Sequence, residues 1–347
     1  MKTANSTRPP LESLACVASE CELYGQAGRN NLLVRKVYGV ERLRYLRCRR
    51  CGREFSERKG TALWNTKVGE AQTVAVAAHL SEGCSPESTA RLTGVDISVV
   101  QRLQGALGRH GQGFHDVRVQ ELTVAALEAD ERHGFSGDKT QAAWEAEVLD
   151  LQSKLVLAHV QGSRDEPLLR RLLADAAQQV TNRHDLVLFT DGEASYATLF
   201  PELFGVPYQP ARQGPTGRRP QIRYRIPRTL AHVQIVKRRE GGRVVEVAIR
   251  YPHSSRKRAA QALGALGYMR PNTSAIERRN GTARRMSVYQ VRKSLAFAHR
   301  ADTKLALGWW GVTVYNWCRT HRALRTPLAS SVGKKSSSPV HRPWPPG

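Results

Sequence analysis

Three acidic residues that are far apart in the sequence have the side-chain chemistry of a divalent-metal site. Asp130 ends a strand-like segment at residues 121–130, Asp191 follows a short apolar segment at residues 186–190, and Glu277 lies in the later segment NTSAIERRNGTARR. Hard cations such as Mg²⁺ and Mn²⁺ prefer oxygen ligands, and carboxylates can hold two such ions about 4 Å apart. The sequence therefore indicates these three acids as candidate ligands of two catalytic metal ions.

Each of the three acids also has a purely structural interpretation. Asp130 can simply end its strand, and the adjacent Glu131 is an equally good ligand. Asp191 begins an Asp-Gly pair, which is common in turns. Ser274-x-x-Glu277 has the spacing of a helix capping box. Residue types and spacing alone leave both interpretations open.

Four cysteines near the N-terminus have the spacing of a structural zinc site. They form the pairs Cys16-x4-Cys21 and Cys48-x2-Cys51, and a glycine follows the second pair. Four thiolates complete a tetrahedron around Zn²⁺ and leave no position open for catalysis. The alternating spacer at residues 32–46 suits strands between two zinc knuckles, and the alternative is four free cysteines in a basic region. The arginines expected to decorate this ribbon and meet phosphates are Arg42, Arg44, Arg47, Arg49, Arg50 and Arg53.

The segment PESTARLTGVDISVVQRLQGAL indicates a helix-turn-helix. Ser85 and Pro86 start the first helix, Gly94 makes the turn, and Ser98-x-x-Gln101 offers a capping box for the second helix. The side chains predicted to pack inward are Ala90, Leu92, Ile97, Val100 and Leu103. The side chains predicted to face a DNA major groove are Ser98, Val99, Gln101, Arg102 and Gln104. A plain helical hairpin is the alternative interpretation.

The middle of the chain predicts an α/β domain that would position the acids. After the strand at residues 121–130, two apolar runs at residues 144–151 and 154–161 predict a hairpin. Pro167 then starts a helix with one apolar face, and residues 186–190 form a short buried strand. This order matches the opening of the RNase H fold, in which the first and fourth strands lie side by side.

The charge of the chain favours a nucleic-acid partner. The sequence has 54 Lys and Arg against 30 Asp and Glu, a net charge of +24 and a pI near 10.4. Such a surplus suits phosphate contacts better than a surface kept basic for solubility. We expect no membrane span, because no run of eighteen apolar residues occurs. The N-terminus lacks the apolar core of a signal peptide, and paired cysteines suit a metal site in a reducing cytoplasm.

A basic stretch lies between Asp191 and Glu277 and is predicted to be an insertion at about residues 206–270. It contains the Gly- and Pro-rich segment PARQGPTGRRPQIRYRIPR, then two strands at residues 232–237 and 243–251 joined by a Gly-Gly turn. A solvated loop is the alternative. The residues expected to clamp the DNA backbone near the acids are Arg218, Arg219, Arg223, Arg225 and Arg228.

Several motifs follow one another in an order that resembles one protein family. RYLRCRRCGREFSERKGTALW comes first, then LEADERHGFSG, LVLFTDGEASY, IERRNGTARRMSVYQVRKSLAFAHR and YNWCRTHRALR. Together with the Cys-x4-Cys pair and the helix-turn-helix, they resemble short bacterial insertion-sequence transposases of the "insertion sequence one" kind. The resemblance covers roughly residues 12–326. The Ile-Glu-Arg-x-Asn-x-x-x-Arg motif that contains Glu277 is its most specific part.

This resemblance implies a DDE transposase with an RNase H-like catalytic domain. Such an enzyme binds the terminal inverted repeats of its element, cleaves the DNA with Mg²⁺ or Mn²⁺, and transfers the freed strand to target DNA. The resemblance implies catalytic roles for Asp130, Asp191 and Glu277. It also implies that Arg278, Asn280 and Arg284 position DNA or brace a carboxylate. Double-stranded DNA, a homodimer or larger assembly on DNA, structural Zn²⁺ and a nucleoid-associated cytoplasmic location complete the expectation.

The expected organisation is a zinc ribbon at residues 12–65, a helix-turn-helix domain at 66–112 and the catalytic domain at 119–326. The Ser- and Pro-rich residues 327–347 are expected to be disordered. The alternative function is a DNA-binding regulator, derived from such an element, whose catalytic domain is inactive. An RNase H-type nuclease acting on RNA–DNA hybrids is a third possibility, against which the N-terminal DNA-binding modules argue.

Overall fold

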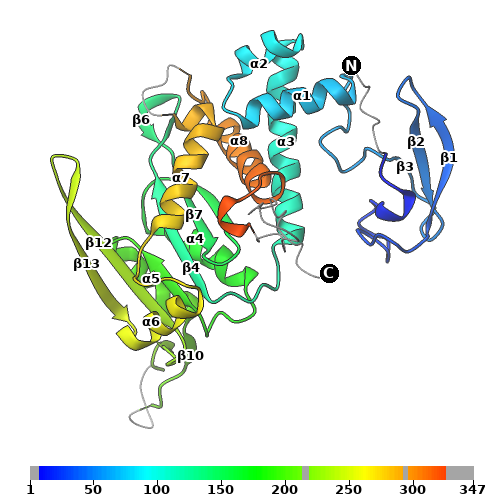
Figure 1. Cartoon of the computed structure of the whole chain (residues 1–347). Coiled ribbons are helices and arrows are strands. Elements are labelled where there is room, and N and C mark those ends of the chain that lie inside the picture. Colours follow the sequence, from blue (N-terminus) through cyan, green and yellow to red (C-terminus); the bar gives the residue numbers. More distant parts are fainter. Residues whose placement is uncertain (1–7, 213–218, 292–295, 326–347) are drawn as a thin grey trace, which may run out of the picture.

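The fold combines helices with a mixed β-sheet and a separate N-terminal sheet. The computed structural model describes residues 8–212, 219–291 and 296–325, so Arg218 and the predicted disordered tail at 327–347 lie outside the described residues. In Figure 1 the N-terminal sheet is blue, a group of helices is cyan, and a larger sheet follows in green and yellow. The orange helices near the C-terminus lie against the cyan helices rather than extending the chain outward.

The N-terminal unit is an antiparallel sheet in the order β1-β2-β3. Its strands are β1 (Leu32–Tyr38), β2 (Leu43–Cys48) and β3 (Glu54–Ser56). They confirm the prediction that the spacer between the two cysteine pairs forms strands. Leu46 and Phe55 are buried with the cysteines in one small apolar cluster.

Glu41, in the turn between β1 and β2, connects this unit to the first long helix, α1 (Glu70–Ser81). Gly69 precedes α1 and has no side chain that could cap it. The Glu41 carboxylate instead accepts a 2.7 Å hydrogen bond from the Glu70 backbone N–H, and Arg58 pairs with both glutamates. The N-terminal sheet therefore supplies the cap that α1 lacks.

The predicted pair of helices is present as α2 (Pro86–Thr93) and α3 (Ile97–Arg118). The Ser85 side chain caps α2 by accepting from the Ser88 N–H at 3.1 Å. Gly94 ends α2 with a φ of 67°, a conformation that glycine adopts without strain. The structure confirms the start of α2 and the glycine turn.

Three details of the helix-turn-helix prediction are wrong. Asp96, rather than a Ser98-Gln101 box, caps α3 by accepting from the Ser98 N–H. Leu92 is 64% exposed instead of packing inward. Gln104 is buried and donates to the Thr303 carbonyl at 3.2 Å, so it does not face a groove. A later helix covers this part of α3, and local sequence does not reveal it.

That later helix is α8 (Ala301–Thr313), which packs closely along α3. At Gly108 an added Cβ would lie 2.4 Å from Ala306, so only glycine permits this approach. Val100 and Leu107 of α3 share a buried cluster with Leu307 of α8. α3 continues without a break to Arg118, beyond residue 112. No helix in the described ranges is long and apolar enough to cross a membrane.

The larger sheet has six strands in the order β13-β12-β9-β4-β7-β8. Its first four strands in the chain are β4 (Ala126–Arg132), β7 (Trp144–Asp150), β8 (Val156–Gly162) and β9 (Val187–Thr190). β4 pairs antiparallel with β7 and parallel with β9, and β7 pairs antiparallel with β8. The predicted hairpin, the predicted buried strand and the contact between the first and fourth strands are all confirmed.

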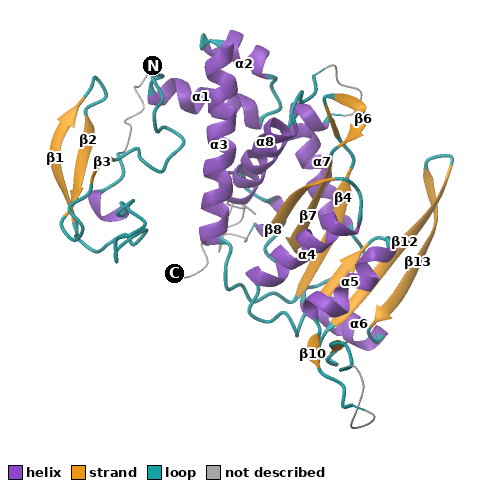
Figure 2. Cartoon of the chain, turned by 180° about the vertical axis from the view of Figure 1, so that it is seen from behind, coloured by secondary structure: helices purple, strands orange, loops and turns teal. Residues whose placement is uncertain are grey.

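Helices cover both faces of this sheet, as Figure 2 shows. On one face lie α4 (Glu166–Gln179) and α5 (Ala194–Phe204), packed on an apolar cluster that includes Leu127 and Ala129 of β4. On the other face lie α6 (Arg256–Ala265) and α7 (Ser274–Met286). The predicted apolar face of α4 is confirmed, because its leucines and Ala176 are buried.

The segment predicted as an insertion at about residues 206–270 contributes to the central sheet instead. β12 (Ala231–Glu240) pairs parallel with β9, and β13 (Arg243–His253) pairs antiparallel with β12. The predicted hairpin with its Gly-Gly turn is confirmed, but β12 is buried in the sheet for its first five residues. The remaining short strands are β5 (Phe135–Ser136), β6 (Asp138–Ala142), β10 (Val206–Tyr208) and β11 (Arg223–Arg225).

Candidate metal centres

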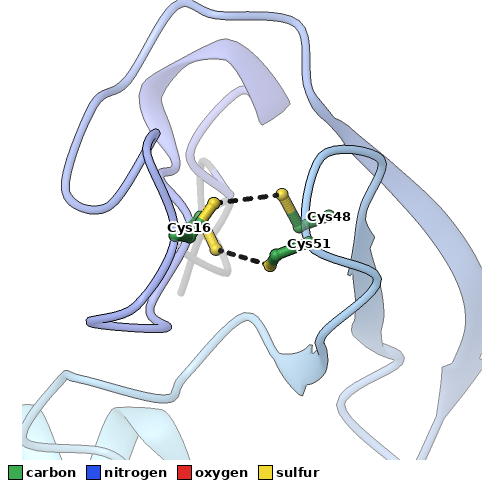
Figure 3. Close-up of side chains that lie close together, drawn as sticks. Cys16, Cys48 and Cys51 are labelled. Atoms are coloured by element: carbon green, nitrogen blue, oxygen red, sulfur yellow. Dashed lines mark hydrogen bonds between the residues drawn. The ribbon is translucent and has the colours of Figure 1, made fainter.

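The four N-terminal cysteines converge from two loops. Their sulfur atoms all lie within 4.8 Å of one another, and Figure 3 shows the side chains of Cys16, Cys48 and Cys51 pointing toward a common centre. The Cys16–Cys51 sulfur separation is 3.6 Å, and the Cys21–Cys48 separation is 4.0 Å. Tetrahedral Zn–S bonds of 2.3 Å require sulfur separations of about 3.8 Å. The donor set and its spacing therefore fit a zinc ion.

The second cysteine pair is arranged to stabilise a thiolate. Burial by itself would raise the pKa of Cys48, but the backbone N–H groups of Cys51 and Arg50 and the Asn31 side chain bring it down to about 6. Gly52, with a φ of 74°, lets its N–H return to the Cys48 carbonyl at 2.9 Å. The pKa of the buried Cys16 thiol is raised to about 12 by desolvation. One preformed thiolate beside protonated thiols can begin metal binding, which releases the remaining protons.

Asp130 and Asp191 lie at the carboxyl ends of two adjacent parallel strands. β4 and β9 pair up to Glu128 and Phe189, so the two aspartates come side by side just beyond that pair. One carboxylate oxygen from each of Asp130, Glu131 and Asp191 lies within 4.8 Å of the others. Such a group of hard oxygen donors fits a divalent cation.

The side chain of Asp130 is held in place by helix α7. The Asn280 side-chain amide of α7 donates to the Asp130 carboxylate at 2.8 Å, and the Glu131 N–H also donates to it at 2.9 Å. Burial, followed by the nearby charge of Asp191, raises the pKa of Asp130 to about 6. Asp191 accepts a 3.0 Å hydrogen bond from the Glu193 N–H at the start of α5. Both acids are thus oriented before any cation binds.

Glu131 points to the opposite face of the sheet from Asp130, because side chains alternate along β4. Its carboxylate is buried, accepts from the Tyr196 hydroxyl of α5 and lies 3.3 Å from Arg164. Burial raises its pKa to about 7, although the Tyr196 hydrogen bond opposes the rise and Asp191 and Asp130 add to it. Glu131 is thus engaged by a hydroxyl of α5 and by an arginine, whereas Asp130 accepts from a backbone N–H and from the Asn280 amide.

Glu277 reaches the same cleft from α7 but stands apart from the group of three acids. Its carboxylate pairs with Lys237 and accepts from the Thr273 hydroxyl at 2.9 Å, and its side chain is 46% exposed. The cleft has a volume of about 670 Å³. The residues lining it are Asp130, Arg164, Asp191, Gly192, Glu193, Ile235, Val236, Lys237, Arg239, Thr273, Glu277, Asn280 and Arg284.

A buried network of charged residues beneath the cleft was missed by the sequence prediction. Arg132 donates to the Asn280 side-chain oxygen at 3.0 Å and pairs with Glu145 and Glu147 at 2.7 Å. Arg279 of α7 pairs with Glu147, and Lys304 of α8 pairs with Glu145. Because Arg132 occupies the amide oxygen of Asn280, the amide nitrogen must face Asp130. Alternation along β4 places Arg132 on the Asp130 face, which is the signal that could have revealed it.

Glu128 is a second residue that the sequence prediction missed. It lies two positions before Asp130 on the same face, is fully buried, and accepts from the Ile276 N–H of α7 at 2.7 Å. Burial raises its pKa to about 7, against the lowering effect of that hydrogen bond. A carboxylate at the amino end of a helix stabilises it. Glu128 therefore anchors the first turn of α7, the turn that carries Glu277.

The predicted arginine clamp does not lie at the cleft. Arg223 belongs to β11, which pairs with β10, and both strands contact α5. The chain then enters β12, whose first residue pairs with the first residue of β9. This is the amino edge of the parallel strands, opposite to Asp130 and Asp191. Arg219, Arg223, Arg225 and Arg228 are exposed there, and Arg218 lies outside the described residues. The cleft instead takes its basic residues from the carboxyl edge: Arg164, Lys237, Arg239 and Arg284.

The other predicted DNA contacts lie on helices α3 and α7. Ser98, Gln101 and Arg102 are exposed on α3, and the last two line a groove between α3 and α8. Arg278 is exposed on α7 and does not line the cleft, whereas Asn280 and Arg284 do.

No protein-family model matches this chain, and no curated protein is similar enough to it to count as a match.

Proposed function

We propose that the protein is a DDE-type DNA transposase that cleaves and joins DNA strands at the acidic cleft. One observation carries the proposal above the others: Asp130 and Asp191 lie just beyond the paired residues of the adjacent parallel strands β4 and β9, and α7 brings Glu277 and Asn280 to the same cleft. Acids from three distant segments thus line one cleft, in the order that the resemblance to insertion-sequence transposases implies.

The sheet order supports an RNase H-like catalytic domain. Numbered by their order in the chain from β4, the five strands β8, β7, β4, β9 and β12 lie in the order 3-2-1-4-5. The second of these strands is antiparallel to the first, whereas the fourth and fifth are parallel to it. This arrangement brings the ends of the first and fourth strands together, as an RNase H-like site requires.

The acids of the cleft bind and orient the reacting groups. Bound Mg²⁺ or Mn²⁺ would activate the attacking hydroxyl and neutralise charge on the leaving oxygen. Asp130 and Asp191 supply fixed oxygen ligands, since Asn280 and the Glu193 N–H hold them in place. Glu277 becomes available as a third ligand when Lys237 turns away from it, for example to a DNA phosphate.

The cleft is also suited to a polyanionic substrate. Arg164, Lys237, Arg239 and Arg284 line it together with the acids, and such side chains position phosphates. Thr273 is the one hydroxyl-bearing residue of the lining, and its hydroxyl donates to Glu277. Direct attack on phosphorus by water or by a DNA 3′-hydroxyl needs no covalent intermediate with the protein. The N-terminal four-cysteine unit and the exposed face of α3 would recognise the DNA ends.

Metal-dependent cleavage of duplex DNA tests this proposal. The substrate is the DNA that flanks the coding sequence, incubated with the full chain and Mg²⁺ or Mn²⁺, and denaturing gels measure nicking and strand joining. We expect cleavage by the wild type to require the metal and to be lost in Asp130→Asn and Asp191→Asn. Glu202→Gln removes one exposed carboxylate of α5 outside the cleft and serves as the matched control.

One contact favours a second candidate function, a DNA-binding regulator without catalytic activity. Lys237 neutralises Glu277 and keeps it out of the group formed by Asp130, Glu131 and Asp191. A regulator of this kind would bind the same DNA with the same affinity in the wild type and both aspartate variants. Equal inactivity of all three proteins with Mg²⁺ and with Mn²⁺, despite tight DNA binding, would reject the transposase proposal.

A further inference from the structure

β13 forms an open edge of the central sheet. The sheet order places it at one end, and among the described residues no strand other than β12 pairs with it. Figures 1 and 2 show the β12–β13 hairpin projecting from the body of the protein, with β13 outermost in both views. A row of its backbone N–H and C=O groups therefore faces outward, where another strand can pair with it.

The side chains of β13 are unusually apolar for an open edge. Four β-branched residues of this strand are between 36% and 51% exposed: Val244, Val245, Val247 and Ile249. Natural edge strands are normally blunted by charges, proline or a bulge. β13 carries Pro252 and one register shift near its end and a second register shift between Val244 and Glu246, so its regular central part runs from Glu246 to Arg250, and these two residues are the charges in it. Such an edge favours pairing over exposure to water.

Backbone geometry restricts how two copies of β13 can pair antiparallel. Opposed residues direct their N–H and C=O groups either both toward the partner or both away from it, and these groups alternate between the two edges along a regular stretch of strand. The numbers of two opposed residues therefore differ by an even number, and a symmetric pair is centred on one residue that faces its own copy. Centring on Ala248 matches the regular stretch from Glu246 to Arg250, which lies between the two register shifts of β13, because Ala248 is its midpoint.

The register centred on Ala248 also matches the charges. It places Glu246 opposite Arg250 of the second copy, and symmetry forms this pair twice. On the other face of the strand, Val247 meets Ile249. Centring on Glu246 would oppose two carboxylates, and centring on Val247 or Ile249 would leave Glu246 and Arg250 opposite uncharged residues.

We propose that β13 is a homotypic docking edge, which pairs antiparallel with β13 of a second copy in the register centred on Ala248. The two six-stranded sheets then continue into one another across a twofold axis. The contact is only one strand wide, so it buries less area than a permanent dimer interface and dissociates on dilution. The inference concerns assembly and does not depend on the chemistry proposed for the acidic cleft.

Duplex DNA is the competing occupant of this edge, because Arg238, Arg239 and Arg243 make the hairpin basic. Aliphatic side chains contribute nothing to phosphate binding, whereas they contribute directly to a strand pair. The opposite charges of Glu246 and Arg250 likewise face each other only when a second copy pairs with this strand. The composition of β13 therefore favours a second copy over DNA.

Reversing the charge at Glu246 or at Arg250 tests the proposal with a protein that stays folded. Glu246→Arg alone places two arginines at each cross-strand position, and Arg250→Glu alone places two glutamates there. We expect each variant to dimerise about tenfold more weakly than the wild type in sedimentation velocity. A mixture of the two variants restores opposite charges at both positions, so its dimerisation should return to within about threefold of the wild type.

The control for this test is Glu240→Arg. Arg238 pairs within the chain with both Glu240 and Glu246, so this variant removes an equivalent ion pair and makes the same change in charge, but on β12. We expect it to dimerise like the wild type. A wild type that sediments as a monomer at every concentration overturns the proposal. Single variants that keep wild-type sedimentation but bind duplex DNA more weakly overturn it in favour of DNA.

A cross-link tests the register separately. Residues facing their own copy at the centre of an antiparallel pair have Cα atoms about 5 Å apart, within disulfide range. Ala248→Cys should form a covalent dimer in oxidised glutathione, above the background from the exposed Cys51 and Cys318. Val244→Cys lies about eight positions from its own copy in this register and should stay at background. Equal cross-linking at both positions would rule out the register centred on Ala248.

Discussion

The four-cysteine unit and the acidic cleft show two ways of preparing a metal site. In the first, the four cysteines come from two short segments, and their sulfurs already lie within 4.8 Å of one another. In the second, the acids come from β4, from the end of β9 and from α7, and Glu277 is paired with Lys237 outside the group of three acids. Four thiolates around a zinc ion would make the first site closed, whereas the acids of the second line an open cleft.

The two sites differ in which contacts determine the positions of their ligands. At the cysteines it is local, because knuckle hydrogen bonds such as Gly52 N–H to Cys48 O set it. At the cleft it depends on long-range packing, because Asp130 is oriented by Asn280 of α7, and Asn280 is oriented in turn by Arg132. The cysteine site should therefore fail as a unit when one ligand is lost, and the cleft should fail by degrees.

The largest effect is expected at the cysteines. Cys48→Ser removes the most thiolate-like ligand, and binding of a structural zinc contributes on the order of 10 kcal/mol to folding such a unit. We expect stoichiometric zinc to be lost, together with the amide protection of β1 and β2, while the central sheet keeps its protection. Elemental analysis and hydrogen exchange measure both results. Retained zinc with protected strands would contradict the closed-site interpretation.

The next effect separates the two neighbouring acids of β4. Asp130→Asn should lower metal-dependent DNA cleavage by about a thousandfold, because it removes a ligand worth several kcal/mol. Glu131→Gln should lower it by no more than about tenfold, since Glu131 is engaged by Tyr196 and Arg164. Single-turnover rates at saturating Mn²⁺ give the comparison. A reversed order of the two variants would assign the ligand to the other face of β4.

A smaller effect is expected from the residue that orients Asp130. Asn280→Ala should weaken Mn²⁺ binding in the cleft by about 10- to 100-fold, the usual cost of losing a group that positions a metal ligand. Isothermal titration with Mn²⁺ measures this affinity, and Thr282→Ala on the exposed side of α7 is the control. An Asn280→Ala protein with wild-type affinity would mean that Asp130 needs no support from α7.

The last effect is the pH dependence of Mn²⁺ affinity. Burial and mutual repulsion raise the pKa of Asp130 to about 6 and that of Glu131 to about 7. Both acids therefore hold protons below these values, and the cation must displace them. Affinity should rise by up to about tenfold per pH unit for each proton displaced, and so by up to about a hundredfold between pH 5 and 6, and become constant above about pH 8. A flat profile across this range would show that the cleft does not bind the cation through these acids.

The sequence predicted local features best. The cysteine spacing, the Ser85 cap, the Gly94 turn and the hairpin at β7 and β8 all follow from neighbouring residues or from strand periodicity, which is why sequence patterns capture them. The contact between β4 and β9 and the shared cleft of Asp130, Asp191 and Glu277 are long-range features, which the order of the strands and motifs suggested.

The failures share one physical cause, which is packing between segments far apart in the sequence. Gln104 was misplaced because α8, about two hundred residues later, covers α3 along a different face. Arg223 was expected at the cleft, but a chain that runs down α5 into a parallel strand must return to the opposite edge of the sheet. Glu128 and Arg132 were missed because α7 and α8 complete their environment.

Glu41 has a consequence for the order in which the chain is built. The four-cysteine unit precedes α1 in the sequence, so during synthesis it leaves the ribosome before α1 does. α1 has no cap of its own and takes one from Glu41, in the turn between β1 and β2. In a newly made chain that has bound zinc, Glu41 is therefore already in place to cap α1 when α1 leaves the ribosome. In a chain without zinc the N-terminal end of α1 would be frayed, and proteases could recognise this end and degrade the chain.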